Sequence, residues 1–591
     1  MNKKLIKSGT FLIWALLLAS CDSNFNVSDE TSNTSDSSSL PAETLAVTDN
    51  TDYFIGQTYR KYGNAQATLL KQETEQTLNI FSDDFVFESF IDPDGGSFSI
   101  DEAFDKVGTY SINLKYKTAT SVSYTIEVKS GAYVPDELAY LSEDIQTNYA
   151  PALGSQKMLV IPIELQPGSA SSYSNWTSTK LDNIFRYYFG ESTSSVASLK
   201  NYFYTASFGQ LNIAGMVSDV YVENSSALTM SAIDNDTTYG KLFSLIARAV
   251  SWIEDHYPNQ DWSEYDTNGD GCLDSVHLVT NYNATNWATP LWPHMYETGN
   301  TSGTPAQPVA NVYSISAINH LNSAITSIHE QGHIFGLQDY YDYSDDGQSV
   351  RNYVGGADMQ SHNVFDWNSF SKLSVGWTKP IVVDGSQNST TVTLRPASAT
   401  GDCLLVPTPG TWNGSAFDEY ILIELFARVG NNVKDWKNWG NLAQGGIRLY
   451  HVDARVYGYN SGGGEYSAGE GGSIVDNVKS SDYNYHVIGA NNSYDASAYM
   501  SVPGFDNFKL LTLIQEGGED TFGSDLSSKR HSLNQDDLFM TGDTFTFSAY
   551  NNFFLKKSSN AMAMNDGTAF PYTINFDYVS ATEARVTVEK N

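Results

Sequence analysis

A chain of 591 residues is too long for one hydrophobic core, so the sequence predicts several domains. Its formal net charge of −35 at pH 7 would repel a phosphate backbone, which excludes nucleic acid as an expected partner. Three cysteines are too few for a disulfide framework. Tyrosine and phenylalanine are abundant while charged residues make up only 17% of the chain, a balance that favours strands over long solvated helices.

The N-terminus has the pattern of an export signal. Its basic start precedes an apolar run at 11–19, which is much shorter than the roughly 20 residues of a membrane-spanning helix. The run ends in Leu-Ala-Ser-Cys21, which resembles the cleavage box of bacterial lipoproteins and implies that Cys21 carries a lipid. We therefore expect residues 1–21 to be a lipoprotein signal peptide. The mature protein would then be exported, with membrane association by its lipid anchor only. A plain signal peptide with a chance cysteine, and hence a secreted protein, is the alternative.

The next part of the chain predicts a spacer. Residues 22–44 are rich in Ser, Thr, Asp and Asn, and we expect them to be a disordered tether. From 45 to 130, short alternating strands such as those at 110–114 and 124–128 predict a small β-sandwich. The end of this segment resembles bacterial immunoglobulin-like modules. Residues 131–154 are expected to be a linker.

A mixed α/β (α+β) domain is predicted at 155–380. It begins with a continuous apolar run at 158–163, typical of a buried strand, and helical spacing of apolar residues follows at 181–189 and 242–253. Strands dominate again at 381–591, which predicts one or two C-terminal β-domains. The expected fold class is therefore multidomain, with the α/β domain flanked by β-structure on both sides.

The strongest chemical signal is at residues 329–333, which read His-Glu-Gln-Gly-His. Apolar residues recur upstream at helical spacing from 318 to 328, with no proline between 319 and 335, so we expect a helix here. On a helix, His329 and His333 lie one turn apart on the same face, where their imidazoles can bind one zinc ion. Glu330 is rotated off that face and is placed to act as general base on the attacking water.

The residues that follow extend this motif. Gly336 can end the helix with a positive φ, and Asp339 can supply a third, oxygen ligand from the returning chain. Asp342 or an oxygen from another loop remain the alternatives for that ligand. Further on, the sequence Gly-Gly-Ala-Asp-Met359 is typical of a turn that supports the metal site from below, as in the metzincin peptidases.

Residues 329–342, HEQGHIFGLQDYYD, resemble the active-site segment of the immune inhibitor A-type bacterial metallopeptidases. The resemblance implies a metzincin-like catalytic domain in which the two histidines and Asp339 hold zinc and Glu330 is the general base. The chain departs from the family at Gln338, where proline is usual, and at Gln360, where a second methionine often follows. Further similar segments lie at 201–211, 266–274, 291–294, 372–377, 419–424 and 445–453.

A second group of oxygen-bearing side chains lies at 266–274. Oxygen ligands at alternate positions, with a glycine for the sharp turn, are typical of a calcium loop. Position twelve of such a loop would be His277 rather than glutamate, so we expect a stabilising site and not a regulatory one. An ordinary turn built on Asp and Asn side chains is the alternative. The candidate calcium ligands are Asp266, Asn268, Asp270 and Asp274.

The sequence thus predicts an extracellular zinc-dependent endopeptidase that acts on protein or peptide substrates. A surface adhesin or binding protein on a catalytically inactive peptidase scaffold is the alternative from another class, and a zinc hydrolase of substrates other than peptides is a third. Tyr340, Tyr341 and Tyr343 follow the histidine motif closely. One of them could donate a hydrogen bond to the tetrahedral oxyanion, but because tyrosine is frequent in this chain, we expect the three to pack instead.

Overall fold

The structure is a computed structural model. The expected signal peptide with Cys21, the tether up to residue 43, and Tyr343 lie outside the described residues. In the part that is described, no helix is long and apolar enough to cross a membrane. The described residues are 44–71, 74–117, 121–141, 149–191, 197–287, 289–321, 323–342, 352–434, 442–459, 473–475, 485–492, 508–522, 532–554 and 563–591.

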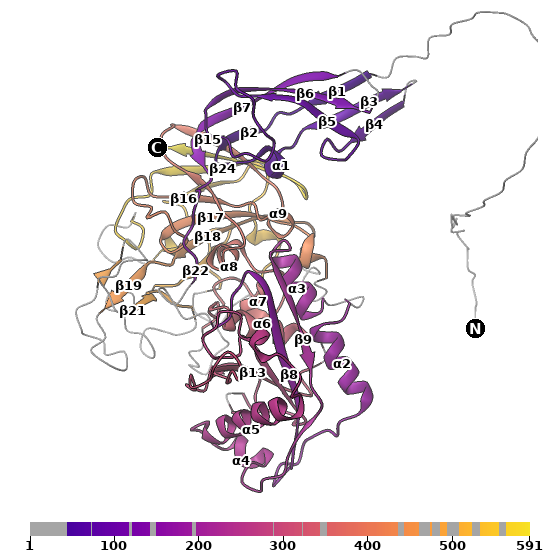
Figure 1. Ribbon diagram of the computed structural model, residues 1–591. Coiled ribbons are helices and arrows are strands. Elements are labelled where there is room, and N and C mark those ends of the chain that lie inside the picture. The colour runs from indigo at the N-terminus through magenta and orange to yellow at the C-terminus, as the bar shows by residue number, and fades with distance from the viewer. Residues whose placement is uncertain are drawn as a thin grey trace, which may run out of the picture.

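The chain is strand-rich and multidomain, as expected. Of the described residues, 34% are in strands and 18% in helices, so sheets set the architecture and helices cover them. In Figure 1 the N-terminal strands (indigo) lie at the top, the C-terminal strands in the middle, and a mixed part of helices and strands at the bottom.

The mixed part is built on a sheet in the order β10-β8-β11-β13-β12, with β9 also paired to β8. β8, β11 and β13 are parallel, and β12 runs antiparallel to β13 at the edge. Every residue of β11 and β13 is buried, because both faces of the sheet are covered. The strands are β8 (Gly154–Leu165), β9 (Leu211–Val217), β10 (Tyr221–Glu223), β11 (Val276–Thr280), β12 (His294–Glu297) and β13 (Val312–Ala317).

Helices cover the two faces of this sheet, because the side chains of its strands form an apolar core on each face, as β8 illustrates. Side chains alternate between the faces of a strand, so Met158 and Val160 join one apolar core while Leu159 and Ile161 join another. The site helix therefore lies on one face of the sheet and the longest helix on the other. The first core takes α2 (Ser178–Tyr188), α3 (Leu199–Ala206) and α6 (Ile325–Ile334), and the second takes α4 (Met230–Asp234) and α5 (Gly240–His256).

The site helix, α6, is shorter than the apolar spacing indicates. It begins at Ile325, whereas Ile318 lies in the turn that leaves β13. The backbone N–H of Ile318 donates to Thr280 O and Tyr282 O, at 3.0 and 3.2 Å. Residues 318–320 form a turn that these bonds tie to the end of β11 and the residues after it, so the apolar residues at helical spacing upstream of Ile325 lie before the helix.

A single nine-stranded sheet joins the N-terminal and C-terminal regions. Its order is β22-β18-β17-β16-β14-β7-β6-β5, with β2 paired to β7. The link is the antiparallel pair of β7 with β14, in which Tyr133 faces Val382 and Ala132 faces Val383. The strands are β2 (Asp52–Ile55), β5 (Phe85–Ile91), β6 (Gly108–Tyr116), β7 (Val122–Tyr133), β14 (Ile381–Val383), β16 (Leu404–Pro407), β17 (Glu419–Phe426), β18 (Gly446–Asp453) and β22 (Leu511–Ile514).

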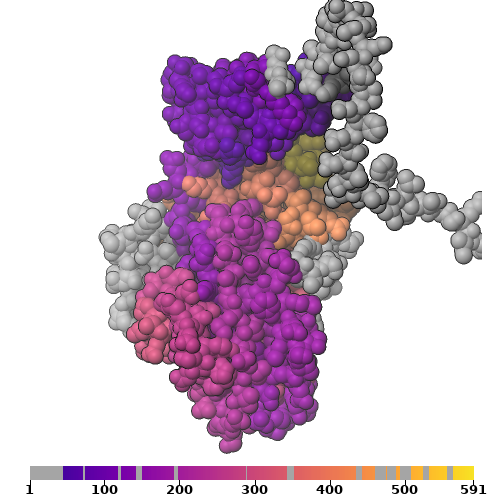
Figure 2. Space-filling model, turned by 45° about the vertical axis from the view of Figure 1, so that its right-hand side comes forward, coloured from indigo at the N-terminus to yellow at the C-terminus, as the bar shows by residue number. Residues whose placement is uncertain are grey.

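The same continuity holds for the apolar side chains. Residues of both regions share one core, and in Figure 2 the indigo N-terminal block lies on the orange C-terminal strands. β7 runs past the expected boundary at residue 130, so the N-terminal β-structure is continuous with the C-terminal one.

Smaller elements complete the fold. The sheets β1-β3-β4 and β15-β25-β24-β23 contribute to the shared core, and β20-β19-β21 is a third small sheet. Their strands are β1 (Thr44–Thr48), β3 (Gln66–Lys71), β4 (Thr74–Leu78), β15 (Ser389–Leu394), β19 (Val456–Tyr459), β20 (Ser473–Ile474), β21 (Tyr485–Ile488), β23 (Thr544–Thr546), β24 (Tyr572–Val579) and β25 (Ala584–Lys590). The short helices are α1 (Tyr59–Tyr62), α7 (Met359–His362), α8 (Ser369–Ser374) and α9 (Ala397–Thr400).

Candidate metal centre

Two histidines and one aspartate meet beside α6. His329 and His333 lie one turn apart, with their Nε2 atoms 3.1 Å apart and their ring planes at 86°. Asp339 Oδ1 lies 2.9 Å from His329 Nε2 and 3.4 Å from His333 Nε2. Within the described residues this is the one group of three or more His, Cys, Asp or Glu side chains whose ligand atoms all lie within 4.8 Å of one another. The three expected zinc ligands are therefore brought to one point.

The other ring nitrogen of each histidine is held by the backbone. His329 Nδ1 lies 2.7 Å from Met359 O, and His333 Nδ1 lies 2.8 Å from Leu337 O. Because a carbonyl can only accept, each Nδ1 carries a proton and donates, which leaves each Nε2, the ring nitrogen that faces Asp339, as the atom available to a metal ion. Two imidazole nitrogens and one carboxylate oxygen are a donor set that zinc prefers. The residues present therefore fit a zinc ion.

The electrostatics of this group favour positive charge. Burial raises the pKa of the Asp339 carboxyl, but the two imidazoles outweigh burial and hold that pKa well below its ordinary value. Burial lowers the pKa of the imidazoles, but Asp339 outweighs it and raises that of His333 to about 9. Glu330 beside them has a raised pKa because it is buried. The three ligands thus attract a proton or a cation, while Glu330 is a stronger base than an exposed glutamate.

Gly336 ends α6 and turns the chain back toward the histidines. Its φ is +92°, a conformation that residues with a Cβ resist. The N–H of Gly336 donates to His333 O at 2.9 Å, and that of Leu337 donates to Gly332 O at 3.0 Å, so the last carbonyls of the helix are satisfied. This reversal places Leu337 O against His333 and brings Asp339 to the cluster.

A second turn holds His329 from the other side. Gly355 and Gly356 both have positive φ, at 67° and 68°, and the chain then enters α7 with Asp358 as its N-cap. Met359 is buried, and its carbonyl is the one that accepts from His329. Met359 thus contacts a metal ligand through its backbone carbonyl, and this contact orients the His329 ring.

Gln360, where the resembled family often has methionine, ties this turn to the site helix. Its Nε2 donates to His329 O at 3.1 Å, and its Oε1 accepts from Trp367 Nε1 at 3.2 Å. A Cβ on Gly332 would meet the Gln360 side chain at 2.3 Å. Gly332 is therefore the residue that lets α6 lie directly against the turn.

The cluster opens onto a cleft of about 680 Å³. His329, Glu330, His333 and Asp339 all line it, and the residues of β12 from His294 to Tyr296 form one wall. The backbone of Met295 hydrogen-bonds Glu330. Aromatic side chains line much of the rest, including Tyr239, Trp287, Trp292 and Tyr341.

The tyrosines after the motif differ in placement. Tyr340 is fully buried, and its hydroxyl lies 2.6 Å from Ser371 Oγ, as packing requires. Tyr341 lines the cleft, so it is placed to contact a substrate. The sequence predicts that it packs instead, because tyrosine is frequent in the chain.

A buried polar network supports α6 from behind. Gln331 Oε1 accepts from Ser275 Oγ at 2.6 Å and lies 2.9 Å from His277 Nε2. Tyr188 OH lies 3.3 Å from His277 Nδ1 and 2.7 Å from Ser327 Oγ. Burial lowers the pKa of His277 to about 4, so the ring is neutral and donates from Nε2. This network fixes the rotation of α6 about its own axis.

The candidate calcium residues are arranged differently. The two oxygens of Asp266 accept from three successive backbone N–H groups, at 269–271, over 2.8, 3.0 and 2.9 Å. Asn268 Nδ2 donates to Asp270 Oδ2 at 3.1 Å, and Asp270 and Asp274 each accept from a further backbone N–H. These are the bonds of a turn built on Asp and Asn side chains. Calcium binding here stays a prediction.

The remaining histidines near the motif have other partners. His294 lines the cleft, and its ring nitrogens lie 2.7 Å from Trp292 O and 3.0 Å from Tyr313 OH; burial lowers its pKa to about 4. His362 Nδ1 lies 2.6 Å from Asn352 Nδ2. The alternative third ligand, Asp342, has its Oδ2 3.9 Å from Lys509 Nζ.

A scan of the sequence against protein-family models found no match, and a search of curated proteins found none either.

Proposed function

We propose that this chain is a zinc-dependent endopeptidase with a metzincin-like catalytic domain, exported and anchored through Cys21, that hydrolyses peptide bonds in proteins or peptides. One observation carries the proposal. Two imidazoles and a carboxylate converge on one point, with a buried Glu330 beside them, on the floor of an open cleft. The resemblance of residues 329–342 to immune inhibitor A-type metallopeptidases supports the same conclusion.

Each residue has a separate role in the proposed reaction. His329, His333 and Asp339 would hold zinc, which when bound supplies a Lewis acid that polarises the substrate carbonyl and activates water near neutral pH. Glu330 accepts the proton of the attacking water at its carboxylate and delivers it to the leaving amine. Burial raises the pKa of this carboxyl, which favours acceptance of a proton.

A peptide substrate is favoured by the strand that borders the cleft. β12 is the last strand of its sheet, with β13 as its one neighbour among the described strands. An extended peptide can add to such an edge through main-chain hydrogen bonds. Residues of β12 also line the cleft and contact Glu330. A substrate bound along β12 would therefore pass the proposed general base.

The proposal is tested by metal analysis of the purified chain together with digestion of an unstructured protein such as casein. We expect close to one zinc per chain, cleavage of internal peptide bonds, loss of cleavage with a chelator, and recovery when zinc is returned. A chain that holds zinc but leaves casein intact while hydrolysing another bond type would be the non-peptide hydrolase. A chain without zinc and without cleavage would be the adhesin scaffold.

A further inference from the structure

Two buried charged residues of the C-terminal sheet lie next to the turn that holds His329. Glu424 on β17 and Arg448 on β18 face each other as cross-strand partners in the nine-stranded sheet. Arg448 Nη2 lies 2.5 Å from Glu424 Oε1, and the two side chains are 3% and 0% exposed. Burying such a pair costs desolvation free energy, and an apolar pair of the same size would serve stability as well. The contacts of this charged pair therefore indicate which task other than stability it serves.

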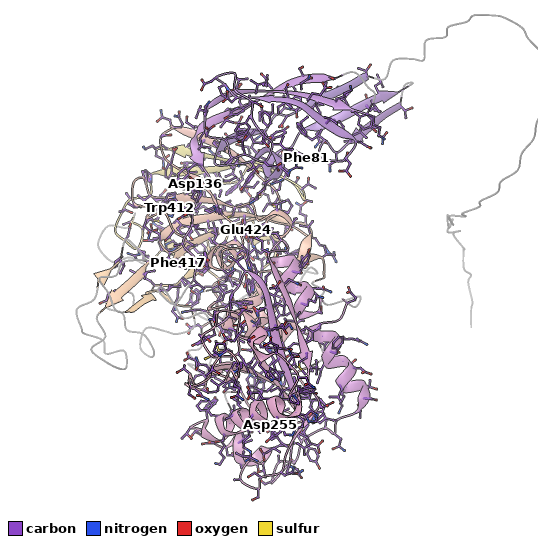
Figure 3. All side chains as sticks on the ribbon, viewed as in Figure 1. Phe81, Asp136, Asp255, Trp412, Phe417 and Glu424 are labelled. Atoms are coloured by element: carbon purple, nitrogen blue, oxygen red, sulfur yellow. The ribbon has the colours of Figure 1, made fainter. Side chains whose placement is uncertain are left out.

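Each member of the pair reaches out of its sheet into the α/β part. Arg448 Nη1 donates to Ala357 O at 2.8 Å. Glu424 Oε2 accepts from the backbone N–H and the hydroxyl of Ser369, at 2.8 and 2.5 Å, where α8 begins. In Figure 3, Glu424 lies in the middle of the molecule, where the C-terminal strands meet the helices below. The pair therefore joins two ends of one segment, 357–369.

That segment contains the turn beneath the metal ligands. Asp358 follows Ala357 directly, and its Oδ2 accepts from both the backbone and the side chain of Asn368, at 2.8 Å each. Met359 comes next and accepts from His329 Nδ1. Only one residue, Asp358, thus separates the carbonyl that Arg448 holds from the carbonyl that orients His329.

We propose that Glu424 and Arg448 are positioning residues for the metal site. They fix the Ala357 carbonyl. Through the turn, which Asp358 holds by its bonds to Gln360 and Asn368, they fix the Met359 carbonyl that sets the tautomer and orientation of the His329 ring. A guanidinium suits this task because its planar fork serves the Glu424 carboxylate and the Ala357 carbonyl at once. The C-terminal sheet is then part of the machinery that shapes the metal site. This inference rests on the function proposed above.

The test compares Arg448→Lys with Arg455→Lys. Arg455 is also buried in this region and pairs with Asp453 at 2.8 and 2.9 Å, so it is a matched control. In the metal-free protein, we expect faster amide hydrogen exchange at 355–362 for Arg448→Lys than for the control. Zinc affinity, measured by competition with a chelator, should weaken about tenfold for Arg448→Lys alone, which is typical of losing a partner that orients a ligand.

A second variant keeps the test decisive if Arg448→Lys fails to fold. The double variant Glu424→Gln, Arg448→Met matches the volume and leaves no unpaired buried charge, and it should show the same faster exchange at 355–362. Exchange and zinc affinity at wild-type values in a folded variant would overturn the proposal, as would an equal effect of Arg455→Lys. If the wild-type chain binds no zinc, the proposed function fails, whereas the exchange measurement still decides whether the pair positions the turn.

Discussion

The loop at 266–274 and the segment at 329–339 both carry several polar side chains at the spacing of metal ligands, but they direct them in opposite ways. In the loop, Asp266 turns both oxygens toward backbone N–H groups of its own turn. In the other segment, backbone carbonyls bind the Nδ1 atoms of His329 and His333, so the remaining donor atoms face one another and Asp339. Both segments have residues at the spacing of metal ligands. The side chains converge on one point at 329–339, where backbone carbonyls bind the Nδ1 atoms and leave the Nε2 atoms facing Asp339.

Among the variants that test this contrast, we expect the largest effect, a loss of zinc affinity, from Asp339→Asn. The change removes the charge that both imidazoles face, and because losing a partner that only orients a ligand costs 10–100-fold, losing a ligand should weaken zinc binding by more than about 100-fold. The matched change Asp274→Asn should leave zinc affinity as it is. Chelator competition measures both variants, and equal affinities would break the comparison.

His277 connects the two segments and predicts a pH dependence. It follows the loop on β11, contacts Gln331 on α6, and its folded pKa is lowered to about 4 by burial. The unfolded chain therefore binds the extra proton first, so stability is present above the ordinary histidine pKa of about 6.5 and falls as pH drops toward 4, by up to roughly 3 kcal/mol. Urea unfolding across this range should show a weaker pH dependence for His277→Gln, but not for the exposed His256→Gln.

Asp266→Ala addresses the loop itself. Loss of a carboxylate that accepts from three N–H groups should lower the free energy of unfolding by roughly 1.5–3 kcal/mol. We expect this loss even without calcium, because the three backbone hydrogen bonds of Asp266 form without an ion. Thermal unfolding in calcium and in chelator checks this. A loss that appears only in calcium would make the loop a calcium site, as its spacing indicates.

Gly332→Ala tests how closely α6 approaches the turn. The new Cβ would collide with the Gln360 side chain, and overpacking of this kind costs about 1–3 kcal/mol. The double variant Gly332→Ala, Gln360→Ala removes the collision and should recover part of the unfolding free energy. A single variant as stable as the wild type would mean that α6 and the turn are less tightly packed.

The parts of the fold and site that depend on neighbouring residues were predictable from the sequence. A helix sets His329 and His333 one turn apart, and a glycine at the helix end permits the reversal that leads to Asp339. The apolar run at 158–163 is a buried strand because its neighbours cover both faces. These features need only local geometry.

Features that depend on distant residues were not predictable. The contact of Arg448 with Ala357 joins two segments 91 residues apart, and the pairing of β7 with β14 joins the two flanking β-regions across the whole α/β part. The spacing of apolar residues along the chain does not indicate which distant segments contact each other. The role of Gln360 was hidden for the same reason, because its partners, His329 and Trp367, are known only once the turn lies against α6.

The most direct test of the central claim is Glu330→Gln, measured for both bound zinc and casein cleavage. The change keeps the size of the side chain and leaves all three ligands in place, but an amide cannot accept the proton of the attacking water. We expect wild-type zinc content and a loss of cleavage of about 10²–10⁴-fold. Cleavage at the wild-type rate would contradict the assignment of Glu330 as the general base, and with it the proposed mechanism.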